Sequence, residues 1–324
     1  MKIKEAIQVN LDEIDLNSID LLICSCGYEE RSRYLANLLC ASGKAAIKNK
    51  VVFHFANDSG DKVSSENTSF FRSQGFEFIE ITHFDLPGKA SRELDRFLRI
   101  GVSSTIFNIL VDYSSMTRVI YSEILRFFHE IKSTCTVNIY FVYVPSEYDG
   151  PGDFKPNFFV GPIAGFDGKM SLPQTPIMLI VGLGYDEIRA LGLIEYFDLA
   201  FERTSVFLTD KSFNPRFAEE AERNNKDLLG RIPQENIYAY PLLDIRTTGN
   251  MLSSLIEANR KHNRIVIAPI GPKPFTLISL LLGIKYPEIS IYRVSQNSDS
   301  LSARIANERG VTITCLVTFV DDNS

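Results

Sequence analysis

Histidine and cysteine are scarce in this sequence, which narrows the chemistry open to it. Four histidines occur in 324 residues, so a histidine-based catalytic triad and a zinc enzyme are both disfavoured. The five cysteines form an odd, mostly apolar set whose nearest pair is spaced C-x-C rather than C-x-x-C. We therefore expect reduced thiols packed in strands, and we predict no metal site and no cofactor.

Long apolar runs and an excess of positive charge are also missing. No stretch approaches the roughly 20 apolar residues that cross a bilayer, and the first residues lack a signal-peptide core. The sequence thus predicts a cytoplasmic protein with no membrane partner. The formal net charge of −6 argues against general nucleic-acid binding, because binding to phosphate backbones needs a field of Lys and Arg. A local basic pocket remains compatible with this charge.

The sequence does contain a regular alternation of predicted strands and helices in two successive halves. This alternation is typical of parallel strands joined by right-handed crossovers. It predicts an α/β fold of two tandem Rossmann-like parallel-sheet domains, at 1–148 and 176–324. A Pro- and Gly-rich linker at 149–175 separates them, and its 154–160 portion could pack as an edge strand. The expected strands are 20–26, 51–56, 76–82, 105–111 and 136–144, then 177–182, 205–209, 236–240, 264–268, 290–294 and 312–319.

Two pairs of turns indicate that the halves arose by internal duplication. The turn that begins at Gly27 has a counterpart at Gly184, and the turn that begins at Asp112 has one at Pro269. Both pairs are 157 residues apart (184 − 27 and 269 − 112). Each turn follows a predicted strand, where open parallel sheets bind ligands. A tandem pair usually forms one shared cleft, so we expect function in the four turns together.

The turn after the predicted strand 105–111 offers the fullest set of binding groups. It has an acid at the strand tip, small hydroxylated residues and a cation at the start of a helix, a set that suits a phosphate or a ribose. The structural alternative is that the hydroxyls only cap the helix and the acid only favours its positive end. The binding candidates are Asp112, Ser114, Ser115, Thr117 and Arg118.

The other turns add further candidates. An aromatic side chain after the first strand of each half could stack a base, and the neighbouring acids either accept from sugar hydroxyls or favour a helix start. These acids would repel a phosphate unless Arg31 or Arg33 turned inward. Turn propensity alone could explain the polar residues after the second strands. The candidates are Gly27, Tyr28, Glu29, Arg31, Asn57 and Asp58 in the first half, and Gly184, Tyr185, Asp186, Asp210, Gly271 and Lys273 in the second.

The segment Asp112-Tyr-Ser-Ser-Met-Thr-Arg118 resembles the signature of the CRISPR-associated Rossmann-fold (CARF) sensor domains. In that family an Asp-x-Thr-Gly-Gly-Thr-Lys-like turn after the fourth strand cradles a cyclic oligonucleotide. A tandem pair of such domains is also similar to the SAVED sensors of bacterial anti-phage systems. By this resemblance Asp112 matches the acid, Ser114 the first hydroxyl, Ser115 the first Gly, Thr117 the Thr and Arg118 the Lys, while Met116 replaces the second Gly.

The resemblance implies a sensor of a nucleotide or cyclic oligonucleotide second messenger in antiviral defence, signalling to an effector protein encoded nearby. Only Gly271 and Lys273 keep the motif in the second half, so it also implies non-equivalent half-sites. One alternative is a metal-independent phosphodiesterase or another nucleotide-processing enzyme, with Ser115, Thr117, Arg118 and Lys273 as catalytic candidates. A second alternative is a non-catalytic interaction subunit. Catalysis and homodimer formation stay open.

Overall fold

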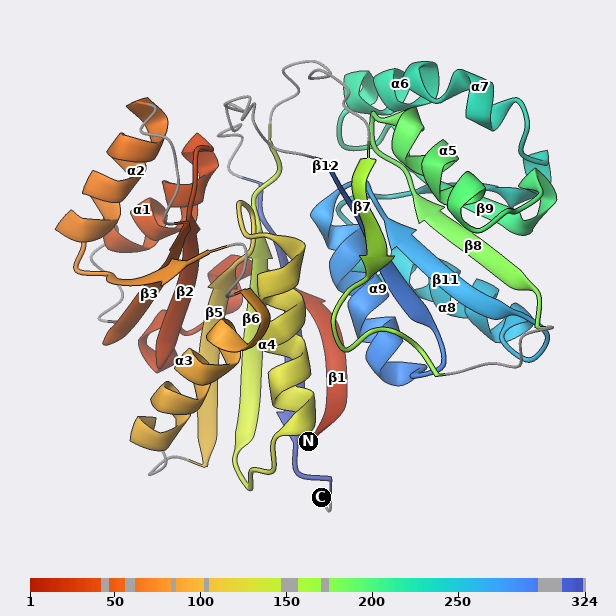
Figure 1. Ribbon diagram of the computed structural model, residues 1–324. Coiled ribbons are helices and arrows are strands. Elements are labelled where there is room, and N and C mark those ends of the chain that lie inside the picture. Colours follow the sequence, from red (N-terminus) through yellow and green to blue (C-terminus); the bar gives the residue numbers. More distant parts are fainter. Residues whose placement is uncertain are drawn as a thin grey trace. The chain divides into compact units, whose positions relative to one another are not determined.

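Strands rich in Val, Ile and Leu build two separate sheets, each within its own unit of the chain. The computed structural model describes residues 1–41, 47–55, 62–82, 86–101, 105–146, 157–169, 175–296 and 311–322. The first unit comprises Met1–Asp149 together with Leu301–Ser324, and the second comprises Gly150–Ser300 (Figure 1). Among the helices of the described residues, none combines the length and the apolar character that crossing a membrane requires.

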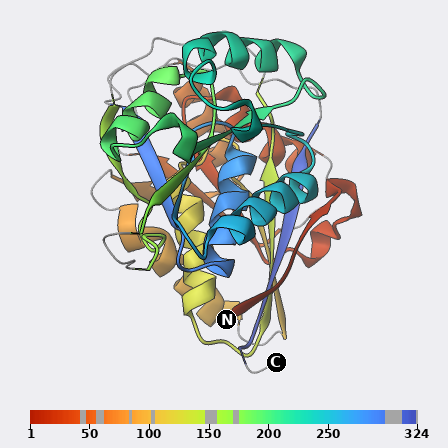
Figure 2. The ribbon, with the colours of Figure 1, turned by 90° about the vertical axis from the view of Figure 1, so that its right-hand side faces the viewer.

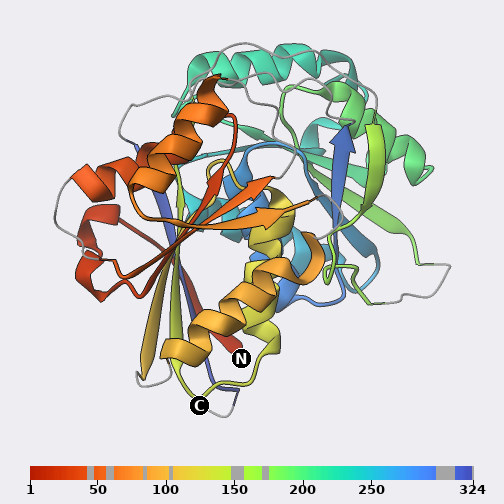
Figure 3. The same ribbon diagram turned by 60° about the vertical axis from the view of Figure 1, so that its left-hand side comes forward.

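The first unit holds a seven-stranded sheet in the order β1-β13-β6-β5-β2-β3-β4. Five strands are parallel, β13 lies antiparallel on β6, and β1 lies antiparallel on β13. Helices α1 and α2 lie on one face of the sheet, and α3 and α4 on the other (Figure 3). The bounds are β1 (Lys2–Val9), β2 (Leu21–Cys26), α1 (Tyr34–Ala41), β3 (Asn49–Phe55), α2 (Lys62–Ser73), β4 (Glu77–Ile81), α3 (Leu86–Gly101), β5 (Ile106–Asp112), α4 (Arg118–Glu130), β6 (Thr136–Tyr143) and β13 (Ile313–Val320).

The second unit holds a six-stranded sheet in the order β10-β9-β8-β11-β12-β7. Strands β8 to β12 are parallel, and β7 lies antiparallel on β12. Helices α8 and α9 pack together on one face (Figure 2). The bounds are β7 (Asn157–Pro162), β8 (Ile177–Gly182), α5 (Glu187–Tyr196), β9 (Thr204–Thr209), α6 (Pro215–Asn224), α7 (Lys226–Leu229), β10 (Ile237–Tyr240), α8 (Ile245–Asn259), β11 (Arg264–Pro269), α9 (Lys273–Lys285) and β12 (Ser290–Gln296).

The two sheets share one topology, which confirms the predicted fold class. Numbered within each half, both parallel sheets read 3-2-1-4-5, and both carry an antiparallel strand beside strand 5. Strands β2 and β8 begin 156 residues apart (177 − 21), and β7 and β13 are separated by the same step (313 − 157). The repeat therefore extends from the first strand of each half to the sixth.

The sixth strands are exchanged between the halves. Strand β7 follows β6 in the chain but pairs with β12, whereas β13 follows β12 but pairs with β6. The C-terminal strand, which we expected to finish the second domain, thus completes the first sheet, and part of the expected linker is a strand of the second sheet. Sequence pattern identifies an edge strand but not the sheet it joins, because both fifth strands offer an equivalent unpaired edge.

Buried apolar strands form the core of each unit. All six residues of β2 are buried, as a strand covered by helices on both faces should be. Cys24, Cys26 and Cys315 are free, buried thiols in strands of the first sheet, as expected from the sequence. Cys40, in α1, and Cys135, just before β6, are also free but only partly buried and not in strands, so the expectation is wrong for these two. Burial raises the pKa of Cys315 to about 12, so this thiol stays protonated near neutral pH.

Candidate functional site

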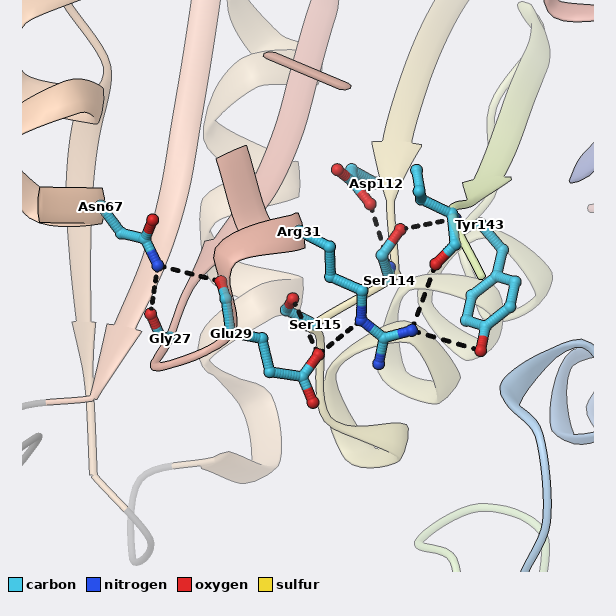
Figure 4. Close-up of polar contacts among 9 residues, drawn as sticks. Gly27, Glu29, Arg31, Asn67, Asp112, Ser114, Ser115 and Tyr143 are labelled. Atoms are coloured by element: carbon cyan, nitrogen blue, oxygen red, sulfur yellow. Dashed lines mark hydrogen bonds and ion pairs between the residues drawn. The ribbon is translucent and has the colours of Figure 1, made fainter. Parts of the chain in front are cut away.

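Three turns meet at the carboxyl edge of the first sheet. They follow β2, β5 and β6, which are neighbours in the order β6-β5-β2. Because the three strands are parallel, their carboxyl ends lie at the same edge. Two turns that are about 85 residues apart in the sequence are thereby brought into hydrogen-bonding contact (Figure 4).

The turn after β5 is tied down by its own acid and first hydroxyl. Asp112 is buried, and its Oδ1 accepts a hydrogen bond from the Ser114 N–H at 3.0 Å. The Ser114 hydroxyl accepts from the Val144 N–H at 2.9 Å, which joins this turn to the end of β6. Burial, and then the nearby Asp112 charge, raise the pKa of Cys24 well above its ordinary value.

The hydroxyls of this turn do not cap the helix that follows. Thr117 occupies the N-cap position of α4 with extended backbone, yet its side chain makes no capping hydrogen bond. Its Oγ1 is buried, and it has no hydrogen-bond partner within the part of the chain that the structure describes. The Ser114 hydroxyl is engaged with Val144. The interpretation that these two hydroxyls serve only as caps is therefore wrong.

Arg31 turns inward from the first turn and joins it to the end of β6. It is 6 % exposed; its Nε donates to Glu29 Oε2 at 2.5 Å, and its Nη1 donates to the Tyr143 hydroxyl at 3.3 Å and the Val144 carbonyl at 3.1 Å. Burial lowers the pKa of Arg31, but Tyr143 and Glu29 raise it by more, so the guanidinium stays charged. Glu29 Oε2 also accepts from the Ser115 hydroxyl at 3.3 Å.

A buried asparagine that the sequence reasoning missed holds the first turn. Asn67 of α2 is fully buried, and its Nδ2 donates to the carbonyls of Gly27 at 2.7 Å and Glu29 at 3.0 Å. Asn225 repeats this contact in the second unit, donating to the Gly184 carbonyl at 2.8 Å. The two asparagines are 158 residues apart (225 − 67), within one residue of the step between the turns, and that spacing was the signal available in the sequence.

In the second unit, glycines bring the corresponding turns together. The Gly271 N–H donates to the Gly182 carbonyl at 2.7 Å. A Cβ on Gly271 would lie 2.2 Å from the Leu183 carbonyl oxygen, so only glycine fits there. Lys273 begins α9 between Pro272 and Pro274, and it is half-buried. Backbone packing in this unit replaces the side-chain network of the first.

The remaining candidates have their own local contacts or lie next to the first network. The Tyr185 ring packs against Phe217 with centroids 4.5 Å apart, and Asp186 pairs with Arg189 at 2.9 Å. The Asp210 carboxylate accepts from the Ser212 N–H at 3.0 Å. Tyr28 and Arg118 are half-buried beside the network of the first unit. Asn57 and Asp58 lie outside the described residues.

Comparison with known proteins gives no family assignment. No family model matches the chain, and no curated protein matches it. Among solved structures, the chain is similar to a universal stress protein from Archaeoglobus fulgidus DSM 4304, at 11% identity and a TM-score of 0.25, covering 87% of this chain and 98% of that one. It is also similar to a functionally unknown protein from Pseudomonas aeruginosa PAO1, at 9% identity and a TM-score of 0.28, covering 87% and 94%. Scores of this size carry no functional argument.

Proposed function

We propose that this protein is a sensor that binds a nucleotide or cyclic oligonucleotide second messenger and signals to a partner protein in a prokaryotic defence system. The observation that carries the proposal is the contact of Glu29 with both Arg31 and Ser115, which joins the turns after β2 and β5. These turns follow strands 1 and 4 of the sheet, where nucleotide-binding α/β proteins place their ligands. The CARF-like spacing of the second turn supports the same reading.

The start of α4 supplies the phosphate-binding chemistry. Arg118 is the first residue of this 13-residue helix, and Thr117 does not cap it with its side chain. The first turn of a helix presents N–H groups and the positive end of the helix dipole to an anion. A cation at that position adds a charge-assisted hydrogen bond to a phosphate. We therefore assign to the start of α4, in the turn after β5, part of the donor set for a bound phosphate.

The second unit supports an asymmetric ligand. At the start of α9, Pro272 and Pro274 each lack an N–H, which removes two of the donors that the matching position could present. Lys273 provides a charge there, whereas the residue that matches Arg118 by the 157-residue step is the buried Phe275. The two halves therefore offer different chemistry to a ligand.

A thermal-shift screen tests the function directly. The panel contains AMP, ATP, cyclic dinucleotides and cyclic oligoadenylates, with adenosine as the uncharged comparison. A ligand at 100 times its Kd stabilises the fold by about 2.7 kcal/mol, which raises the melting temperature measurably. If no phosphate-bearing nucleotide shifts the melting temperature, the sensor proposal fails, and the chain is better described as an interaction subunit.

Replacing Arg118 tests the assigned phosphate position. We expect Arg118→Ala to weaken binding of the nucleotide identified in the screen by about 1.5–3 kcal/mol, the range for a hydrogen bond to a charged group. The melting temperature should stay nearly unchanged. The matched control is Arg126→Ala, which removes an arginine that pairs with Glu130 further along α4. Titration calorimetry provides the measurement, and equal losses in both variants would contradict the assignment.

The contact between Ser115 and Glu29 favours a second candidate, a metal-independent phosphodiesterase on the same scaffold. A hydroxyl hydrogen-bonded to a carboxylate can position a reacting oxygen, and nearby cations can stabilise the transition state. Incubation of the protein with cyclic oligoadenylates separates the candidates. Linear products indicate the enzyme, whereas intact ligand that remains bound indicates the sensor.

A further inference from the structure

We infer that Glu29 is an internal competitor for the anion site of the first unit: its carboxylate occupies the position on Arg31 that a phosphate takes when ligand binds. The inference rests on the proposed function and adds a gate to it. By the gate we mean the Glu29 side chain, which blocks Arg31 until an anion displaces it. In the free protein the site is closed by the chain's own acid. An anionic ligand opens it by displacing one side chain.

The geometry around one carboxylate oxygen is that of a bound anion. Glu29 Oε2 accepts from Arg31 Nε at 2.5 Å and from the Ser115 hydroxyl at 3.3 Å. A guanidinium and a hydroxyl converging on one anionic oxygen is also the donor set that recognises a phosphate oxygen. The side chains of Arg31 and Glu29 are 6% and 12% exposed, so the pair is screened little by solvent.

Arg31 stays in place when Glu29 leaves. Its Nη1 is held by the Tyr143 hydroxyl and the Val144 carbonyl, and its guanidinium carbon lies 5.5 Å from the centre of the Tyr143 ring. None of these contacts involves Glu29. The cation is thus preorganised for an incoming anion.

Only the side chain of Glu29 has to move. Its backbone carbonyl is fixed by the Asn67 amide at 3.0 Å, and the same amide fixes the Gly27 carbonyl at 2.7 Å. The turn therefore keeps its conformation while the carboxylate rotates away. Because a buried guanidinium without a counter-charge is costly, only a ligand that brings its own negative charge can replace Glu29. The gate selects phosphate-bearing ligands over neutral nucleosides.

The second unit lacks this gate. By the 157-residue step the position of Arg31 is taken by Ile188, which is 48% exposed. The matching acid, Asp186, pairs instead with Arg189 three residues on in the same helical segment. That pair is local, because its two residues are three positions apart in the sequence. The inference therefore concerns one gated anion site, in the first unit alone.

Neutralising the competitor tests the inference. Glu29→Gln keeps the size of the side chain and removes its charge, and the probes are inorganic phosphate and AMP, with adenosine as the neutral comparison. When a competitor occupies a site, the apparent Kd equals the intrinsic Kd divided by the fraction of molecules in which the site is open. We therefore expect Glu29→Gln to bind phosphate and AMP about 10- to 100-fold more tightly than the wild-type protein does. Glu66→Gln is the matched control, since Glu66 pairs with Arg33 at 3.3 Å in the same unit.

The outcomes separate the gate from the proposed function. Tighter phosphate binding by Glu29→Gln with no binding of any nucleotide supports the gate and refutes the sensor. The gate is overturned if Glu29→Gln binds phosphate and AMP no more tightly than the wild-type protein does. It is also overturned if neither protein binds phosphate or AMP, whether or not another nucleotide binds. If Glu29→Gln does not fold, Glu29→Asp, which withdraws the carboxylate by one methylene from Arg31, is measured in its place with the same expected direction.

Discussion

Two buried asparagines fix the first turn of each half through the same contact. Asn67 and Asn225 are both fully buried, and each donates from its side-chain amide to a glycine carbonyl. Without such a donor, these partly buried carbonyls would lose a hydrogen bond, which would lower the free energy of unfolding. The amides thus stabilise the turn that, in the first unit, carries Glu29 and Arg31.

Asn67→Ala should lower the free energy of unfolding by about 1–3 kcal/mol, because two carbonyl oxygens lose their donor. The comparison variant on the same helix is Ser69→Ala, whose exposed hydroxyl bonds only within α2. Chemical denaturation with a spectroscopic readout measures both. Equal stability of the two variants would show that the amide contact contributes nothing.

For single residues, the sequence predicted which of them lie at the carboxyl edge of the first sheet but not which contacts they make there. Parallel strands bring their carboxyl ends together, so the turns containing Arg31 and Ser114 could be placed by pattern alone. Spacing does not determine which way a side chain turns. The inward turn of Arg31 and the bond from Val144 to Ser114 depend on the end of β6, a third segment that the motif does not include.

At the scale of elements, the two halves join their ligand-side turns by different means. The first unit uses charged and hydroxyl side chains, whereas the second uses close backbone contact at Gly182 and Gly271. The Gly271 contact leaves no room for a side chain, because the nearest atom is a carbonyl oxygen of the backbone. The glycine that resembled part of a phosphate-binding motif thus has a packing role.

Gly271→Ala should destabilise the protein by about 1–3 kcal/mol, the range for overpacking. We expect Gly249→Ala in α8 to stabilise the protein instead, because a Cβ there would meet only a side-chain carbon at 3.8 Å. Alanine favours a helix over glycine by about 1 kcal/mol, so that variant should gain stability. Thermal denaturation of the pair distinguishes a steric effect from a general effect of replacing glycine.

Most elements could be predicted from the sequence because their apolar periodicity is strong. The strand 177–182 has the predicted bounds, and 136–144 differs from β6 by one residue. Strand β1 was missed, since most of its residues are exposed and charged or polar side chains interrupt its apolar pattern. Its pairing with β13 could not be inferred until the sheet that β13 joins was known.

At the scale of the whole molecule, the exchanged sixth strands connect the halves more firmly than a single linker would. The first sheet contains β6 from the N-terminal half and β13 from the C-terminal end. Strand β13 pairs with both β1 and β6, so it lies within the first sheet rather than at its edge. Removing it would expose the backbone of two strands.

A single break in the chain should therefore leave the protein assembled. We expect a variant with a protease site inserted after Asp149 to give two bands on a denaturing gel after cleavage. In native buffer the two pieces should elute together from a sizing column, because the second piece carries β13 into the first sheet. The uncut variant is the control, and separate elution of the pieces would contradict the exchange.

The exchange also governs when the first unit can finish folding during synthesis. Between the end of β6 at Tyr143 and the start of β13 at Ile313 the ribosome must add 170 residues (313 − 143). At about 5–20 residues per second this takes roughly 8–34 s. Throughout that interval the nascent chain carries an uncovered β6 edge, the kind of surface that chaperones bind and that aggregates.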